Sequence, residues 1–361
     1  MSTDPSAAGS PSSAAHSPAT PADLARVQAA IARIRNQLQQ AIVGQSSVLD
    51  DLLTALLAGG HCLLVGVPGL AKTLMVRSMA ETLGLTFQRI QFTPDLMPAD
   101  ITGTDVIQED RMAGTRQLTF MRGPVFANVI LADEINRTPP KTQAALLEAM
   151  QERQVTISGQ RHGLPDPFFV LATQNPIEQE GTYPLPEAQL DRFMLQVFVD
   201  YPSEEEEYRI VCQTTATESV RIDKVVTGEE LIAMQSIVRQ LPIAEHVTRY
   251  ALALSRSTRK EAPEAPEIVR KYVRWGAGPR ASQFLVLAAK ARAAMLGENH
   301  VTPEHVRAVA KPVLRHRIMT NFHAEADRVT TDRIVDSLLA ATPLVPTHRS
   351  SLAPVAAVLK R

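Results

Sequence analysis

The segment Gly66-Val67-Pro68-Gly69-Leu70-Ala71-Lys72-Thr73 is the feature that most constrains what this chain can fold into. It follows an apolar run at residues 62–65 and precedes a helical pattern at 73–83, which is the context that a phosphate-binding loop requires. In such a loop, backbone N–H groups and the positive end of the following helix surround phosphate oxygens. Lys72 is expected to reach the β and γ phosphates of a nucleotide, and the Thr73 hydroxyl to coordinate magnesium.

Ala71 departs from the general loop pattern, which has glycine at this position. A methyl group adds little strain if the residue keeps a negative φ, so a negative φ is expected at Ala71. The alternative is a glycine-rich turn between strand and helix that arose by chance. It is disfavoured because Lys72 and Thr73 stand at the correct offset.

Two further apolar runs end in polar side chains that suit the same chemistry. Residues 129–132 lead into Asp133 and Glu134, and residues 168–173 lead, through Gln174, into Asn175. Apolar strands of open sheets deliver functional groups at their C-terminal ends. Asp133 is predicted to hold the hydration shell of magnesium, and Glu134 to orient and deprotonate the water that attacks the γ phosphate. Asn175 is predicted to hold that water or the γ phosphate, with a loop-capping asparagine as the alternative.

Helical patterns alternate with short apolar runs, which predicts a parallel sheet covered by helices on both faces. The alternating segments are residues 48–57, 62–65, 73–83, 129–132, 142–150 and 168–172. Two period-two stretches with a glycine turn, at 105–120 and 154–164, predict β-hairpins that project from this domain, although the second could equally be an irregular loop.

Composition and pattern divide the chain into four parts. Residues 1–22 are rich in Ala, Ser and Pro and predict a disordered arm. Residues 23–200 predict the α/β nucleotide-binding domain, residues 201–340 a smaller all-helical domain, and residues 341–361 a C-terminal tail. The helices expected in the second domain are 204–215, 229–240, 244–258, 281–296 and 303–317.

The charge balance makes nucleic acid an unlikely partner, because 37 Lys and Arg face 38 Asp and Glu and only 4% of residues are aromatic. Cys62 and Cys212 lie far apart and predict neither a disulfide framework nor a zinc site, which fits a cytoplasmic protein. No secretory signal is recognisable at the N-terminus. The uncharged stretch 52–71 is broken by glycines and a proline, so no membrane span is expected.

With these elements in order, the sequence resembles the AAA+ ATPases and, within them, the MoxR family. The matching stretches lie between residues 42 and 318: IVGQ at 42–45, GVPGLAKT at 66–73, FTPDLMPADITG at 92–103, the blocks 123–152 and 172–193, and GPRAS at 278–282. The resemblance implies an AAA+ core with a helix-2 insert, here the hairpin at 105–120, followed by a helical lid. Alanine at position 71 is usual in this family.

The resemblance implies ATP and Mg²⁺ as cofactors and assigns further nucleotide contacts. Residues 42–45, among them Val43, Gly44 and Gln45, would border the adenine. The loop from Gly66 to Thr73 would hold the phosphates, and Leu74 would follow it in the site.

The resemblance also implies roles for residues that spacing alone does not assign. Asn175 would be the sensor-1 residue, Arg192 the arginine finger, and Arg280 the sensor-2 arginine, acting in its own subunit or on a neighbour. Because an arginine finger acts across a subunit boundary, the resemblance implies a homo-oligomeric ring, expected to be a hexamer. An arginine suits this role because it keeps its charge and its planar fork can bind a phosphate.

Structural alternatives exist for two of the conspicuous side chains. Arg192 could instead form a helix-end salt bridge with Asp191 or Glu187. Trp275, the only tryptophan, is expected in the core of the lid rather than at a ligand.

Three functions remain open on the sequence. The favoured one is a MoxR-like ATPase whose ring remodels or matures a partner protein, often one with a von Willebrand factor A domain. The second is a slow nucleotide switch that assembles on ATP and only scaffolds its partner, and the third is a DNA-directed motor. Hydrolysis is favoured because Glu134, Asn175 and Arg192 are all present, and the neutral charge weakens the DNA motor.

Overall fold

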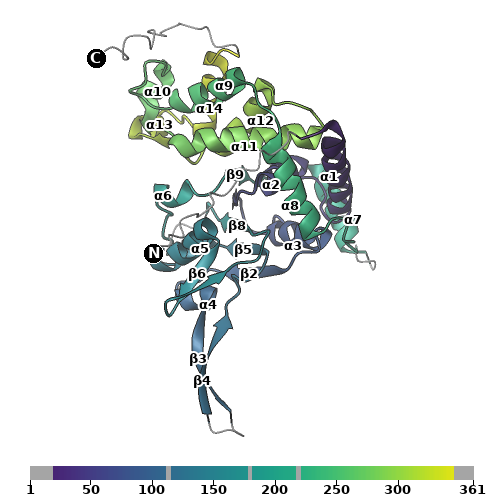
Figure 1. Cartoon of the computed structure of the whole chain (residues 1–361). Helices are drawn as coiled ribbons and strands as arrows, with labels where there is room; N and C mark the ends of the chain where they lie inside the picture. Colours follow the sequence, from purple (N-terminus) through teal and green to yellow (C-terminus); the bar gives the residue numbers. More distant parts are fainter. Residues whose placement is uncertain (1–18, 111–114, 178–180, 217–220, 345–361) are drawn as a thin grey trace, which may run out of the picture.

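A five-stranded parallel sheet lies at the centre of the computed structural model, which describes residues 19–110, 115–177, 181–216 and 221–344 (Figure 1). The strand order is β2-β5-β8-β1-β9. The strands are β1 (Cys62–Val65), β2 (Phe87–Gln91), β5 (Val129–Asp133), β8 (Phe169–Gln174) and β9 (Leu195–Phe198). The predicted parallel sheet is confirmed, and β2 and β9 join it at its two edges without having been expected.

Helices cover both faces of the sheet because alternate side chains of its inner strands point to opposite faces. Leu63, Ile130 and Val170 pack into one buried cluster together with Leu146 and Leu147 of α5 (Pro140–Glu152). The residues that alternate with these along the same strands, among them Leu64, Leu131 and Leu171, pack in the cluster of α1 (Pro21–Ala41), α2 (Ser46–Ala58) and α3 (Lys72–Thr82). The doubly covered sheet is therefore the predicted one.

Helix α1 begins earlier than expected. Its first residue is Pro21 and its N-cap is Thr20, whose hydroxyl accepts a hydrogen bond from the Asp23 N–H at 3.2 Å while the Asp23 carboxylate accepts one from the Thr20 N–H at 3.1 Å. This reciprocal capping satisfies two free N–H groups and starts the helix inside the segment that was assigned to the arm. Residues 1–18 lie outside the described residues.

Both predicted hairpins are present as insertions outside the central sheet. Strands β3 (Gly103–Asp110) and β4 (Thr115–Arg122) form the long arm below the domain in Figure 1, and their expected turn at 113–114 lies outside the described residues. Strands β6 (Gln154–Ile157) and β7 (Gln160–Gly163) form the second hairpin, which excludes the irregular loop. The connections also contain α4 (Pro98–Thr102), the 3₁₀ turn Ile135–Arg137 and α6 (Glu187–Leu190).

The C-terminal part is helical, as expected, and also contains a two-stranded sheet of β10 (Val273–Trp275) and β11 (Met319–Thr320). Its helices are α8 (Gly228–Gln240), α9 (Glu245–Arg256), α10 (Glu267–Tyr272), α11 (Pro279–Leu296), α12 (Pro303–Leu314), α13 (Phe322–Ala326) and α14 (Thr331–Ala341). They share one continuous buried core with α1 and α2. Helix α7 (Glu204–Thr214) stands apart from this bundle, beside α1 (Figure 1). Within the described ranges, no helix is long and apolar enough to cross a membrane.

The expectation for Trp275 is wrong, because 71% of its surface is exposed. In β10 the buried position belongs to Val273, and the two residues after it face solvent. Trp275 instead lines a small surface pocket with Arg259 and Arg274.

Candidate active site

Three polar segments meet at one edge of the central sheet because the strands that precede them are parallel and in register. Val65 at the end of β1 is paired with Gln174 of β8, and Gln91 of β2 with Asp133 of β5. The loop after β1, the carboxylates after β5 and Asn175 after β8 therefore surround one cavity of about 370 Å³. Its lining consists of residues 68–73 together with Arg89, Asp133, Glu134, Thr173 and Asn175.

The loop after β1 is fixed by close packing and by its own lysine. Gly66 has no room for a side chain, since a Cβ there would lie 2.6 Å from the Val199 carbonyl oxygen. Lys72, the first residue of α3, donates to the carbonyl oxygens of Gly66 and, at 2.9 Å, Val67. Partial burial lowers the pKa of Lys72, and the nearby Asp133 and Glu134 carboxylates oppose that shift.

Ala71 does not have the expected negative φ. Its φ is +53° and its ψ +21°, which is the left-handed region, and it is the N-cap of α3. An L-residue in this region costs about 1–2 kcal/mol relative to the right-handed one. The conformation lets the Ala71 carbonyl accept the first helical hydrogen bond, from the Met75 N–H at 2.9 Å, while the preceding loop keeps its curvature around the cavity.

Asp133 is nearly buried and both of its carboxylate oxygens have partners. Oδ1 accepts a hydrogen bond from the Thr173 hydroxyl at 2.6 Å. Oδ2 accepts two from the guanidinium of Arg89, from Nε at 3.0 Å and from Nη2 at 2.6 Å. Thr173 thus orients the carboxylate, and Arg89 neutralises it.

Glu134 follows Asp133 in the left-handed region, with φ +56°, which turns its side chain away from the line of the strand. Its N–H donates to the Thr173 hydroxyl at 2.8 Å. Its Oε2 accepts from Gln91 Nε2 and from Arg137 Nη1, both at 3.0 Å. Backbone strain of this kind persists where the surroundings fix it and is common at functional sites.

Asn175 lines the cavity and also makes the loop contact that was its structural alternative. Its side chain is buried, and Oδ1 accepts a hydrogen bond from the Ile177 N–H at 3.1 Å. This bond fixes the rotation of the amide at the end of β8.

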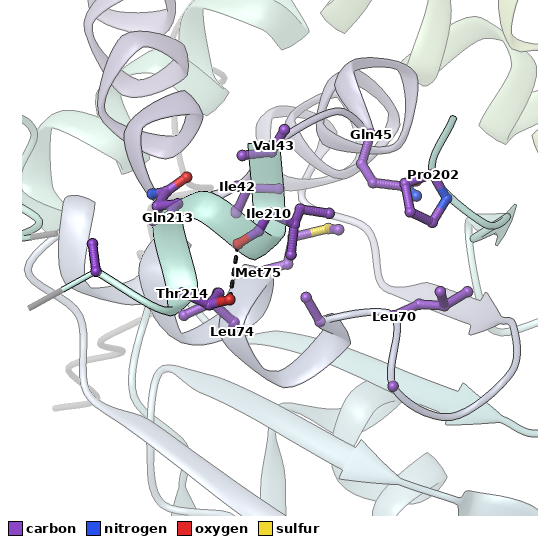
Figure 2. A pocket seen from close by; sticks show the side chains of 14 residues that line it. Ile42, Val43, Gln45, Leu70, Leu74, Met75, Pro202, Ile210, Gln213 and Thr214 are labelled. Atoms are coloured by element: carbon purple, nitrogen blue, oxygen red, sulfur yellow. Dashed lines mark hydrogen bonds between the residues drawn. The ribbon is translucent and has the colours of Figure 1, made fainter. Parts of the chain in front are cut away.

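The residues expected at the adenine form a second cavity, of about 460 Å³, that adjoins the first through Gly69, Leu70 and Ala71. Figure 2 shows Val43, Gln45 and Leu74 around it. Gly44 does not line it. With φ +71°, Gly44 faces the Glu206 side chain, which a Cβ would approach to 2.6 Å.

Helix α7, which the sequence analysis assigned to the second, helical domain, closes one side of the apolar cavity. Ile210, Gln213 and Thr214 line the cavity, as Figure 2 shows. Gln213 donates to the Gln40 carbonyl oxygen at 2.6 Å, which ties α7 to the end of α1. The two cavities together offer an apolar end for a base and a charged end for phosphates.

The charged cavity fits a magnesium-bound nucleotide. The Thr73 hydroxyl and the Asp133 carboxylate are the hard oxygen ligands that Mg²⁺ prefers, and Mg²⁺ is usually held by one or two carboxylates with phosphates and waters. Among the described residues there is no cluster of three or more His, Cys, Asp or Glu that would form an all-protein metal cage.

Arg192 and Arg280 lie outside both cavities of their own chain. Arg280 Nη1 contacts Asp191 Oδ2 at 3.3 Å, and Arg317 Nε donates to Asp191 Oδ1 at 2.8 Å. The structural alternative for Arg192, a salt bridge with Asp191 or Glu187, is absent: in the described part of the chain, Arg192 forms no ion pair.

Sequence reasoning missed four residues of the site: Arg89, Gln91, Arg137 and Thr173. Arg89 and Gln91 belong to the unexpected strand β2, and their contacts depend on its pairing with β5. The sequence did contain a signal for Thr173, because it is the polar residue that ends an otherwise apolar run.

Comparisons with known proteins agree with this geometry. The model of the ATPase family associated with various cellular activities (AAA) matches residues 61–195, and that of the AAA lid domain residues 265–338. The chain is 42% identical to Chaperone MoxR1 of Mycobacterium tuberculosis over 88% of this chain and 85% of that protein. It is 30% identical to Protein MoxR of Methylorubrum extorquens, over 86% and 92%. A crystal structure of a candidate ATPase from Cytophaga hutchinsonii superimposes with a TM-score of 0.83 at 40% identity, covering 90% of this chain and 97% of that one.

Proposed function

Since the chain belongs to the MoxR family of AAA+ ATPases, we propose that this P-loop ATPase hydrolyses Mg–ATP at the interfaces between the subunits of a hexameric ring. We further propose that the ring uses this energy to remodel or mature a partner protein that carries a von Willebrand factor A domain. The relative named Chaperone MoxR1 supports a chaperone-like role.

The residues of the charged cavity divide the work. Lys72 and the loop amides bind the β and γ phosphates, and Thr73 and Asp133 supply oxygen ligands to the metal. When bound, Mg²⁺ neutralises phosphate charge and orients the γ phosphate for attack. Glu134 exchanges a hydrogen bond from Gln91 or Arg137 for one from the attacking water, whose proton it accepts. Asn175 holds that water or the γ phosphate.

Arg192 carries the argument for a ring. It lies outside both cavities of its own chain and forms no ion pair with the described residues, although it directly follows the doubly paired Asp191. A guanidinium with this placement suits a site on a neighbouring subunit, where it would stabilise the charge that develops on the phosphate. In a head-to-tail ring, every active site then takes Glu134 from one subunit and Arg192 from the next.

Mixing two inactive variants tests this arrangement. Arg192→Ala and Glu134→Gln should each bind ATP and hydrolyse it poorly, since an arginine finger contributes roughly 10³–10⁵ in rate. In an equal mixture with subunit exchange, about a quarter of the interfaces pair an intact Glu134 with an intact Arg192, so ATPase activity should return toward that fraction of the wild type.

The control is a mixture of Arg192→Ala with the double variant Arg192→Ala, Glu134→Gln, which contains no complete interface and should stay inactive. The ring-interface proposal fails if the first mixture also stays inactive while light scattering shows that mixed rings have formed.

The partner is tested by affinity capture with Glu134→Gln held in ATP, followed by identification of the proteins retained. A protein with a von Willebrand factor A domain should be retained by Glu134→Gln and lost with Lys72→Ala, which cannot bind the nucleotide. Equal retention by both variants would refute an ATP-dependent client.

A further inference from the structure

Arg89 places a second cation inside the phosphate cavity, next to Lys72. It lies in β2, and both of its bonds to Asp133 go to one oxygen, Oδ2, at 3.0 Å from Nε and 2.6 Å from Nη2. The other oxygen of Asp133 is held by the buried Thr173 hydroxyl. Three of the four acceptor positions of the carboxylate that is to serve magnesium are therefore occupied by the protein, including both positions on Oδ2.

We propose that Arg89 is a displaceable counter-ion of Asp133: it occupies the carboxylate while the site is free of nucleotide, and it must leave when Mg²⁺ binds with the nucleotide. Arg89 thereby sets the Mg²⁺ concentration at which the active site is loaded. This inference rests on the proposed role of Asp133 as the metal-site carboxylate.

Charge and exposure support an exchange rather than a permanent bond. The Asp133 side chain is 13% exposed and oriented by Thr173, whereas the Arg89 side chain is 48% exposed and lines the cavity. A magnesium ion, or a water bound to it, cannot bind Oδ2 while Arg89 is there, because two N–H groups already occupy both lone pairs of that oxygen. For the ion, repulsion between the two positive charges at contact distance adds to this. The long and half-exposed side chain is the partner that is free to move.

Arg89 is also held by Gln91, the cross-strand partner of Asp133, which keeps the guanidinium close enough to return. Its Nη2 donates to Gln91 Oε1 at 2.6 Å, two residues along the same strand. Lys72 is held in a comparable way on the carbonyls of Gly66 and Val67. Both cations of the cavity are thus bound to protein oxygens, and both must change partners when phosphates and metal enter.

Arg89→Gln should lower the half-saturating Mg²⁺ concentration for nucleotide binding about twofold to fivefold, the range expected for losing a half-exposed ion pair. The measurement is a MgCl₂ titration of nucleotide-free full-length protein with a ribose-labelled fluorescent ADP, followed by fluorescence anisotropy. Chelation of Mg²⁺ by the free nucleotide is the same for every variant, because each is titrated at the same nucleotide concentration. ADP keeps hydrolysis out of the readout.

Arg77→Gln is the matched control, because it removes an arginine from α3 whose partner is the exposed Glu81. It should leave the Mg²⁺ titration unchanged. Arg89→Lys keeps the charge but cannot make the two-nitrogen contact, so its Mg²⁺ midpoint should lie between those of the wild type and Arg89→Gln. It also serves as the test variant if Arg89→Gln does not fold, as judged by thermal unfolding.

The outcomes separate this inference from the function on which it rests. Asp133→Asn should lose most of the Mg²⁺ response of the wild type. If it does, and Arg89→Gln needs as much Mg²⁺ as the wild type or more, the counter-ion role of Arg89 is refuted and the metal role of Asp133 stands. If Asp133→Asn responds to Mg²⁺ as the wild type does, the metal assignment itself is refuted, and the inference with it.

Discussion

Replacing Arg317 by methionine should destabilise the protein more than any other single change at the junction of lid and sheet. The side chain is 2% exposed and follows α12. It donates to the Asp191 carboxylate at 2.8 Å and to the carbonyl oxygens of Asp191 at 3.0 Å, Phe193 at 2.5 Å and Met194 at 3.2 Å. Arg317 therefore fastens the lid to the segment between α6 and β9, which includes Arg192.

The magnitude follows from what methionine would leave unpaired. Asp191 is 31% exposed and keeps its contact with Arg280, so the main cost falls on the carbonyl oxygens that lose the Arg317 donor. A buried acceptor left without its hydrogen bond costs about 1–3 kcal/mol. Burial lowers the pKa of Arg317 to about 10 against the opposing effect of Asp191, so the guanidinium remains charged at neutral pH and its loss is the loss of a cation. With several such acceptors affected, we expect Arg317→Met to lower the free energy of unfolding by about 3–5 kcal/mol.

Arg280→Met is the matched control, because Arg280 binds the same carboxylate from a side chain that is 38% exposed. Half-exposed ion pairs contribute about 0–1 kcal/mol. Urea unfolding followed by circular dichroism measures both variants, and the fluorescence of Trp275 reports on the lid separately. The reasoning is refuted if Arg317→Met is no less stable than Arg280→Met.

Substitutions at three further positions test individual features of the site and its support. Lys72→Ala should abolish ATP binding measured by calorimetry, since the phosphates lose the loop's lysine, and unchanged affinity would refute the phosphate assignment. Ala71→Gly should leave the free energy of unfolding unchanged or raise it. Ala71→Val should lower it by more than about 1 kcal/mol, because a β-branched residue fits the left-handed region poorly. A valine variant more stable than the glycine variant would contradict the +53° φ. Burial raises the pKa of Asp51 to about 6, although the charges of Arg292 and Arg315 oppose this shift. Between about pH 4 and pH 6 the folded chain therefore keeps a proton that the unfolded chain has released, so the wild type loses stability as the pH rises through this range. Asp51→Asn lacks this loss. Its free energy of unfolding relative to the wild type should rise by about 2 kcal/mol between pH 4 and pH 7, whereas a constant difference would contradict the buried carboxyl.

Local sequence patterns were sufficient to predict the residues at the centre of the phosphate cavity. The phosphate loop and Asp133 directly follow an apolar run, and Asn175 follows one with only Gln174 between, so one strand and the next few residues were enough to place them at a common sheet edge. Strand β2 was not predicted because its sequence, FQRIQ, lacks a continuous apolar run: it is polar at the positions that face the cavity and the edge of the sheet. The contacts of Arg89 with Asp133 follow only from the pairing of β2 with β5, which joins segments 44 residues apart.

The backbone conformation of single residues and the partners of side chains across the fold were harder to predict from the sequence. The left-handed φ of Ala71 is imposed by the loop that bends around the cavity, and the residue type alone favours the opposite sign. The salt bridge with Asp191 that was the structural alternative for Arg192 does not form, because Arg317, 126 positions beyond Asp191 in the sequence, binds that carboxylate instead. Rules based on local spacing cannot predict competition for one carboxylate from a residue so distant in the sequence.

The boundary that composition placed at residue 201 passes through the nucleotide site itself. Helix α7 starts with four glutamates, as a solvated helix does, yet Ile210 and Thr214 further along it close the apolar cavity opposite Val43. The base would therefore contact the segment before the sheet, the loop after β1 and the segment after β9. These three segments are separated in sequence but adjoin one cavity, so a bound nucleotide would connect them directly. Removal of α7 should on this argument weaken adenine recognition while leaving the phosphate cavity, with Lys72 and Asp133, complete.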